Sequence, residues 1–159
     1  MATTLLYGEY DLSIDEKGRV SIPSDVRKSL NGEEHGEAFF IVTGDGHPWL
    51  YPEKTYLAMV SKLASEMSPA DDMLAFDRMK FAMASKETPD KQGRIQIREK
   101  TLRRAGLGRD VTMIGVRDHL ELWNRAEWEA RSEELLARSA EISLKAQQAR
   151  LANPQQQGS

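Results

Sequence analysis

The stretch DEKGRVSI at residues 15–22 has a second copy, DKQGRIQI, at residues 90–97. Each copy places an Asp four residues before an Arg, with a Gly directly before that Arg and apolar residues at alternate positions after it. A second pair of segments follows in the same order, LYPEKTYLAMV at residues 50–60 and LWNRAEWEARS at residues 122–132. Self-similarity at a fixed interval is typical of a duplicated structural unit. The sequence therefore predicts two copies of one fold unit.

The start of each unit predicts a β-hairpin. Residues 10–15 (YDLSID) and 19–23 (RVSIP) alternate in polarity, as half-buried strands do, and flank a Gly-bearing turn. Gly18 and Gly93 are expected to have a positive φ, which other residues reach only with strain. Short β-branched or aromatic runs predict further strands at residues 38–44, 47–52, 111–116 and 119–123.

Helical spacing and helix-start signals predict the remaining elements. Two helices that begin near a proline are expected at residues 52–67 and 69–84. A short helical turn is expected at residues 24–30, with Ser24 as a candidate cap. Residues 125–151 predict one longer helix with a weak coiled-coil pattern, and residues 153–159 a disordered tail. The apolar stripe of the 69–84 helix is expected to lie in the core; it consists of Met73, Phe76, Met79 (or Lys80) and Met83.

Composition limits the class of protein. The chain has 159 residues, enough for one domain or two very small ones, and no cysteine. The absence of cysteine excludes disulfides and thiolate zinc sites and fits a reducing compartment. The N-terminus shows no signal peptide, and no apolar run is long enough to cross a bilayer.

Charge is distributed unevenly along the chain. The net charge is −3, yet residues 78–109 contain ten basic and three acidic residues and carry +7, which leaves −10 for the rest. Such asymmetry can create a positive face on an acidic protein. An ordinary solvated surface accounts for a charge run of this kind equally well.

Several segments together resemble the MraZ family of bacterial transcriptional regulators, over residues 7–131. These are DEKGRVSIPSDVR (15–27) and DKQGRIQI with LRRAGL (90–107), each followed by its aromatic segment. The family belongs to the swapped-hairpin SpoVT–AbrB-like superfamily. The resemblance implies an α+β fold with two pseudo-symmetric repeats, residues 5–58 and 82–128, each half of an interleaved β-barrel. Flanking helices belong to this fold, and residues 129–159 are expected to form the end of a long C-terminal helix and the tail.

The same resemblance implies a function in transcription regulation. It implies a ring-shaped homo-oligomer that binds direct repeats in double-stranded promoter DNA, including the promoter of the division and cell-wall gene cluster. The expected location is the cytoplasm, at the nucleoid. No cofactor, metal, membrane or small-molecule substrate is expected.

The sequence also departs from the family pattern. Arg98 stands where the family usually keeps a proline, at the position that matches Pro23. This change is expected either to loosen the strand exit or to add a phosphate contact. The chain beyond Arg131 is longer than the resemblance leads us to expect.

The family signature, Asp-x-x-x-Arg, corresponds here to Asp15 with Arg19 and to Asp90 with Arg94. DNA binding needs cations along the phosphate track and donors that reach base edges, and the planar fork of Arg can donate twice to guanine. The candidate DNA-binding residues are Lys17, Arg19, Arg27, Lys91, Arg94 and Arg103. The candidate motif-orienting residues are Asp15, Asp90, Gly18 and Gly93. An Asp–Arg clamp across the turn is the alternative role, which can coexist with DNA contact, and Arg27 and Arg103 are equally candidates for internal partners of acids.

Two other classes of function are alternatives to DNA binding. A paired-carboxylate hydrolase built on Asp15 and Asp90 is disfavoured, because charged or polar residues follow each Asp in an exposed turn. A structural ring or protein-interaction adaptor would dock through the C-terminal helix, although Trp123 and Trp128 are expected to anchor that helix. The three histidines show no metal spacing and are expected in loops or turns, and residues 44–46 predict only a hairpin turn.

Overall fold

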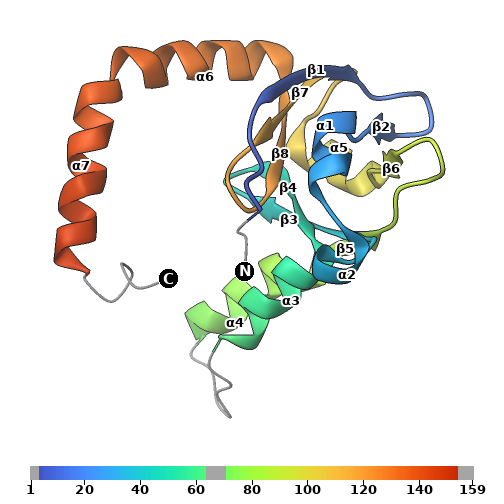
Figure 1. The fold of residues 1–159 in the computed structure, drawn as a ribbon, viewed down its shortest axis with the longest axis horizontal. Helices are drawn as coiled ribbons and strands as arrows, with labels where there is room; N and C mark the ends of the chain where they lie inside the picture. The colour runs from blue at the N-terminus through green and yellow to red at the C-terminus, as the bar shows by residue number, and fades with distance from the viewer. Residues whose placement is uncertain (1–3, 64–70, 154–159) are drawn as a thin grey trace. The chain divides into compact units, whose positions relative to one another are not determined.

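The structure, a computed structural model, describes residues 4–63 and 71–153. Contacts divide the chain into a body, Met1–Arg125, and a helical unit, Ala126–Ser159. The body contains every strand of the described residues, together with the helices that lie between the strands in the sequence (Figure 1). The predicted repeat boundaries, residues 5–58 and 82–128, stay a prediction.

The main sheet is antiparallel and has six strands in the order β1-β7-β8-β4-β3-β5. Its hairpins, β3–β4 and β7–β8, meet in the middle, where Trp49 lies opposite Glu121 and Leu50 opposite Leu120. The first strand of each repeat is exchanged: β1 pairs with β7 of the second repeat, and β5 pairs with β3 of the first. The strand bounds are β1 Glu9–Ser13, β3 Phe39–Gly44, β4 His47–Pro52, β5 Ser85–Glu87, β7 Asp110–Gly115 and β8 Leu120–Asn124.

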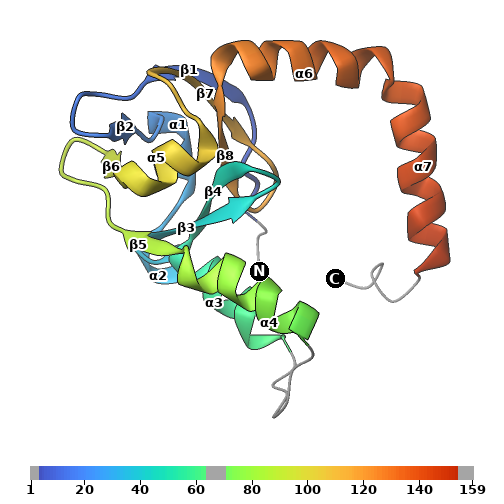
Figure 2. The ribbon, with the colours of Figure 1, turned by 180° about the vertical axis from the view of Figure 1, so that it is seen from behind.

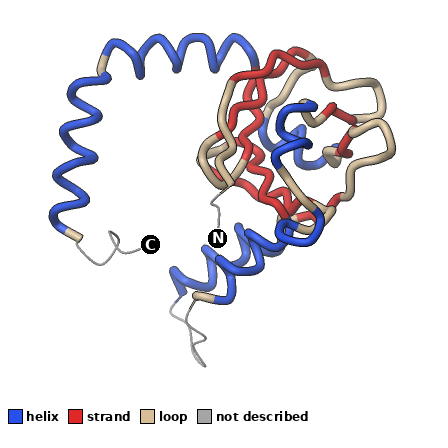
Figure 3. The backbone as a smooth tube through the Cα atoms, in the orientation of Figure 1, coloured by secondary structure: helices blue, strands red, loops and turns tan. Residues whose placement is uncertain are grey.

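A separate two-stranded ribbon joins the two repeats. Strand β2 (Arg19–Ser21) pairs with β6 (Arg94–Gln96), so that Val20 lies opposite Ile95. The expected hairpin is therefore wrong in its pairing. Within each loop the Asp N–H donates to the Arg carbonyl, as in a hairpin, but the strands on either side of the loop pair with the other repeat. Figure 3 shows β2 and β6 as two short strands, each preceded by a loop and followed closely by a helix.

One hydrophobic core lies between the ribbon and the main sheet. The inward side chains of the ribbon, Val20 and Ile95, are 1% and 0% exposed. Because both repeats contribute to this cluster, neither half buries an adequate core alone. The other buried members are Leu6, Ile14, Ile22, Val26, Phe39, Ile41, Leu50, Ile97, Val111, Met113, Leu120 and Leu122.

A short helix follows each strand of the ribbon. The ribbon strands lead into α1 (Ser24–Ser29) and α5 (Glu99–Ala105), and α2 (Gly32–His35) follows α1. The cap of α1 is Pro23, with no side-chain cap bond, so the prediction of a Ser24 cap is wrong. Arg98 caps α5 with φ −65° and ψ 145°, close to the −54° and 142° of Pro23. The missing proline therefore does not change the path of the strand exit.

The helices after β4 leave an apolar surface exposed. Figure 2 shows α3 (Glu53–Ser61) beside α4 (Asp71–Asp77), which continues as a π-helix over Arg78–Ala82. The stripe expected in the core is 41–48% exposed at Met73, Phe76, Met79 and Met83. That expectation is wrong for this chain taken alone, because helical spacing defines an apolar face without saying what covers it.

The helical unit consists of two helices. Strand β8 ends directly before α6 (Arg125–Ala137), and α7 (Ser139–Ala152) follows, so the single predicted helix is interrupted at Arg138. No residue of α6 or α7 among those described is buried. Most of the predicted tail, residues 154–159, lies outside the described residues.

Candidate nucleic-acid interface

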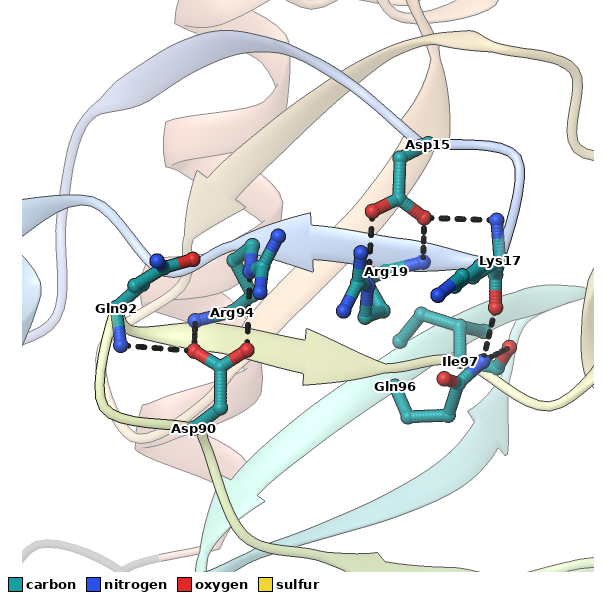
Figure 4. A network of polar contacts seen from close by, with 8 residues as sticks. All are labelled: Asp15, Lys17, Arg19, Asp90, Gln92, Arg94, Gln96 and Ile97. Atoms are coloured by element: carbon teal, nitrogen blue, oxygen red, sulfur yellow. Dashed lines mark hydrogen bonds and ion pairs between the residues drawn. The ribbon is translucent and has the colours of Figure 1, made fainter.

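Two loops of matching geometry lie at the ends of the ribbon (Figure 4). In loop 1 (residues 15–19), Oδ1 of Asp15 accepts hydrogen bonds from the backbone N–H groups of Lys17 and Arg19, both at 2.9 Å. Its Oδ2 accepts from Arg19 Nε at 2.8 Å. The carboxylate thus holds the loop backbone and orients the arginine side chain at the same time.

Loop 2 (residues 90–94) repeats this arrangement. Asp90 Oδ1 accepts from the N–H groups of Gln92 and Arg94 at 2.9 and 3.0 Å, and Oδ2 accepts from Arg94 Nε at 2.9 Å. The two proposed roles of the Asp, turn clamp and arginine support, coexist in both copies. The sequence repeat therefore corresponds to a repeat in three-dimensional geometry.

The electrostatics of the loops disfavour a paired-carboxylate enzyme. The backbone N–H of Arg19 has the largest effect on the pKa of Asp15 and lowers it; burial opposes this, and the Arg19 side chain and the Lys17 N–H add to the lowering, so that the pKa lies below its usual range. Arg94 does the same for Asp90. A carboxylate dyad needs one member whose pKa is raised, so that it carries a proton at working pH. Both carboxylates here are stabilised in the ionised form.

Each loop depends on its glycine. Gly18 and Gly93 have φ of +79° and +80°, as predicted. The glycine N–H donates to the Asp carbonyl at 3.0 Å in loop 1 and 2.9 Å in loop 2. Both glycines are closely covered: a Cβ on Gly18 would lie 2.9 Å from the Ile97 carbonyl oxygen, and one on Gly93 would lie 2.6 Å from Arg27 Cζ.

The arginines share the outer face of the ribbon with two shorter side chains. Arg19 lies opposite Gln96, and Arg94 lies opposite Ser21, while Val20 and Ile95 between them point to the core. The side chains of Arg19 and Arg94 are 27% and 31% exposed. Each Asp engages its arginine through Nε, so that the guanidinium is held in one orientation at a solvent-accessible surface.

The other candidate cations differ from one another. Lys17 and Lys91 are exposed within the loops. Arg27 donates from Nε to the Ile22 carbonyl at 3.1 Å, and its guanidinium covers Gly93. Arg103 lies 4.0 Å from Glu99, and both side chains are largely exposed. The internal partner of Arg27 is therefore a carbonyl rather than an acid.

Gln96 is a further residue of this site that the sequence motifs did not indicate. Its Nε2 donates to the Lys17 carbonyl at 2.6 Å and to the Ile97 carbonyl at 3.2 Å, so that it binds the backbone of loop 1 from the other repeat. The available signal was its place in the repeat alignment, where the first copy has Ser21.

The positive charge of residues 78–109, the basic segment, is partly neutralised by ion pairs. Arg98, a candidate phosphate contact, donates from Nε to Glu87 at 2.9 Å. Ion pairs in this segment also include Lys86–Glu53, Arg94–Asp90 and Arg103–Glu99. Positive charge for a partner is thus concentrated at fewer positions than the count of basic residues indicates.

The histidines are all buried, and two of them lie outside the expected loops or turns: His35 ends α2 and His47 begins β4, whereas His119 lies in the turn before β8. His35, His47 and His119 are 8%, 8% and 6% exposed. His119 lies between Asp118 and Glu121, with 2.8 Å from each ring nitrogen to a carboxylate oxygen. Burial lowers the pKa of His119, but the hydrogen bonds to Glu121 and Asp118 outweigh it and raise the pKa overall.

This buried network sits where the repeats meet. The ring of His47 stacks on Trp123 at 3.7 Å, and the ring of His119 stacks on Trp49 at 4.2 Å. Trp123, 4% exposed, also donates to Glu121; it lies within β8 and is buried in the body, and its role as an anchor for the C-terminal helix stays a prediction. Over residues 4–63 and 71–153, no group of His, Asp and Glu is arranged to hold a metal ion.

No helix in the described part of the chain has both the length and the apolar character needed to cross a membrane.

The exchanged strands, the shared core and the paired Asp–Arg loops define a two-repeat protein with swapped hairpins. A family model described as "MraZ protein, putative antitoxin-like" matches residues 5–79 and again residues 81–153. The chain belongs to the MraZ family, as the sequence motifs predicted.

Relatives of similar length support this assignment. A protein of Acetivibrio thermocellus named transcriptional regulator MraZ is 40% identical over 129 residues, which cover 80% of this chain and 87% of the relative. A protein of the same name from Heliobacterium modesticaldum is 34% identical over 142 residues, or 89% of this chain and 96% of the relative. A third, from Clostridium tetani, is 34% identical over 126 residues, which are 79% and 85% of the two chains.

Proposed function

We propose that this chain is a non-enzymatic, sequence-specific DNA-binding transcriptional regulator. Its partners are double-stranded promoter DNA and further copies of itself in a ring-shaped homo-oligomer. The sites are direct repeats, including those in the promoter of the division and cell-wall gene cluster, and the place of action is the nucleoid in the cytoplasm. One observation carries the proposal: two loops of the same Asp–Arg geometry lie on one exposed ribbon.

The roles within the loops follow from chemistry. Arg19 and Arg94 contact base edges, because a guanidinium held at Nε still presents its terminal nitrogens to a guanine. Asp15 and Asp90 orient these arginines, and Gly18 and Gly93 permit the turn. Phosphate contacts come from Lys17, Lys91, Arg27 and Arg103.

A ring of several protomers explains how a chain with a negative net charge binds DNA, which is also negatively charged. One protomer presents few cations, and its net charge is −3. Linked copies raise the effective concentration of each later contact, so that weak single sites add up on repeated DNA. Binding is thereby restricted to sites whose spacing matches the protomers.

Mutation of the arginines tests the proposal. Genomic fragments bound by the protein are first selected, and a duplex with two copies of the enriched repeat is then titrated by fluorescence anisotropy. Arg19→Ala and Arg94→Ala are each expected to weaken binding about 10- to 100-fold, the value of one bidentate base contact. Light scattering should show an unchanged oligomer mass.

Lys62→Ala is the matched control, since it also removes one positive charge but lies at the end of α3, away from the ribbon (Figure 1). It is expected to change affinity less than twofold. Equal affinity of wild type, Arg19→Ala and Arg94→Ala would reject the role given to the loops.

Salt dependence separates DNA binding from an adaptor function. The logarithm of affinity should fall linearly with the logarithm of salt concentration, with a slope of about −0.9 per phosphate neutralised. A protein that binds no selected DNA, or binds it without salt dependence, would favour the adaptor.

A further inference from the structure

The two loops have the same internal hydrogen bonds but different external supports. Loop 1 is contacted by Gln96, which donates to the Lys17 carbonyl at 2.6 Å. Loop 2 is contacted by Arg27, whose guanidinium covers Gly93 while its Nε donates to the Ile22 carbonyl. Each support comes from the opposite repeat.

The supports are not equivalent positions in the two repeats. The repeat alignment places Ser21 where Gln96 stands, and the short side chain of Ser21 ends at its hydroxyl. With one residue inserted in the second copy, it places Arg103 where Arg27 stands, and Arg103 lies near Glu99 rather than over Gly18. Gly18 is instead approached by Gln96 Nε2 and by Leu102 Cδ1.

The mechanical consequences differ. A hydrogen bond to the Lys17 carbonyl holds the peptide group between Lys17 and Gly18, inside loop 1, and resists its rotation. A guanidinium over Gly93 limits movement of loop 2 toward α1 by contact, without a bond to the loop. Ribbon bonds reinforce both loops equally, Ile97 N–H to the Gly18 carbonyl and Ile22 N–H to the Gly93 carbonyl, each at 2.8 Å.

We infer that Gln96 and Arg27 are positioning residues for the loops of the opposite repeats: Gln96 holds loop 1 by a hydrogen bond, and Arg27 holds loop 2 by packing on Gly93. The role in DNA recognition rests on the proposed function, because the loops carry Arg19 and Arg94. The two supports act independently, each on one loop.

Hydrogen–deuterium exchange of the DNA-free protein tests the inference, with mass spectrometry of peptides that cover each loop. Gln96→Leu removes the donor without adding charge and is expected to speed exchange of the Lys17 and Arg19 amides about fivefold, the effect of one lost hydrogen bond. Arg27→Lys keeps the charge but removes the planar group, and it should speed exchange in loop 2 instead. In each variant the other loop is expected to stay within twofold of wild type.

Ser21→Ala is the matched control on the outer face of the ribbon and is expected to leave both loops unchanged. Gln96→Ala guards against an effect of the leucine side chain itself and should reproduce the Gln96→Leu pattern. Unchanged exchange in the supported loop, or equal acceleration of both loops, would overturn the inference.

A double-mutant cycle for DNA affinity links the supports to recognition. Gln96→Leu is expected to weaken binding about fivefold in wild type but less than twofold in Arg19→Ala, because loop 1 then has no base contact to position. Arg27→Lys should couple in the same way to Arg94→Ala. Additive effects across both cycles would contradict the positioning role. If the wild type binds no selected duplex, the proposed function fails, whereas the exchange experiment still decides whether the supports act.

Discussion

Replacing the loop glycines with alanine separates backbone strain from close packing. Gly18, Gly93 and Gly46 have φ of +79°, +80° and +77°, so alanine meets nearly the same backbone strain at all three positions. Their surroundings differ. A Cβ on Gly46, in the β3–β4 turn, meets nothing within 4 Å, whereas Cβ atoms on Gly18 and Gly93 would overlap neighbouring atoms.

The expected losses of stability follow from these contacts. Gly46→Ala should cost about 1 kcal/mol, the penalty of a side chain in the left-handed region. At Gly93 the obstacle is the end of the Arg27 side chain, which can move away at the loss of its bond to Ile22, for about 2 kcal/mol in total. At Gly18 the Cβ would also approach the Ile97 carbonyl oxygen at 2.9 Å. Because that backbone belongs to the ribbon, Gly18→Ala should cost about 3 kcal/mol.

Urea unfolding at one fixed protein concentration, followed by tryptophan fluorescence, measures the three values. Fixed concentration matters because an oligomer makes apparent stability depend on the amount of protein. The order Gly18→Ala, Gly93→Ala, Gly46→Ala is expected, from largest to smallest loss. If Gly46→Ala destabilises the protein as much as Gly18→Ala, the contacts around loop 1 do not restrict it and this reasoning is refuted.

Three further outcomes are expected. The pKa of His119 is raised above its ordinary 6.5 in the folded state, so its stabilising effect is complete below about pH 6.5 and is lost as pH rises through the folded value. The urea midpoint of wild type should therefore fall with rising pH more steeply than that of His119→Gln. Ile95→Val should cost about 0.5–1.5 kcal/mol and Ile95→Ala about 2–5 kcal/mol in the same assay, because Ile95 is fully buried. Arg98→Pro should change the free energy of unfolding by less than about 1 kcal/mol. Proline fits the φ of −65° at this position, and the stability gained from its rigid backbone offsets the loss of the exposed ion pair with Glu87. A larger loss would show that the backbone at Arg98 does not follow the same path as at Pro23.

Local pattern in the sequence predicted which segments form strands and turns. Alternating polarity around Asp15 and Asp90 identified the turns, and short apolar runs identified β3, β4, β7 and β8. Pattern alone did not identify strand partners. The apolar side chains of β1 and β2 could be buried equally well whether these strands paired with each other or with strands of the other repeat. The core that both repeats share favours pairing with the other repeat. The short strand β5 was missed because its three residues carry too little alternation.

The buried polar groups were the least predictable part. Helical or metal spacing gives no signal for His119 and Glu121, which lie two residues apart, directly before β8 and within it. Their partners include Trp49 of the other hairpin, so the network exists only after the two repeats pair. Gln96 escaped notice for the same reason, because its acceptor, Lys17, is 79 residues away.

Fusion of two repeats into one chain has a consequence for the kind of DNA site. Two identical subunits have exact twofold symmetry, and their operators are palindromic. In this chain the halves have diverged at the proposed interface: loop 1 has Lys17 at the position where loop 2 has Gln92, and strand β2 has Ser21 at the position where β6 has Gln96. The two ends of the ribbon therefore differ chemically, and the ribbon has a direction. Under the proposed function, protomers related by rotation in a ring present that direction repeatedly, which fits direct repeats and not inverted ones.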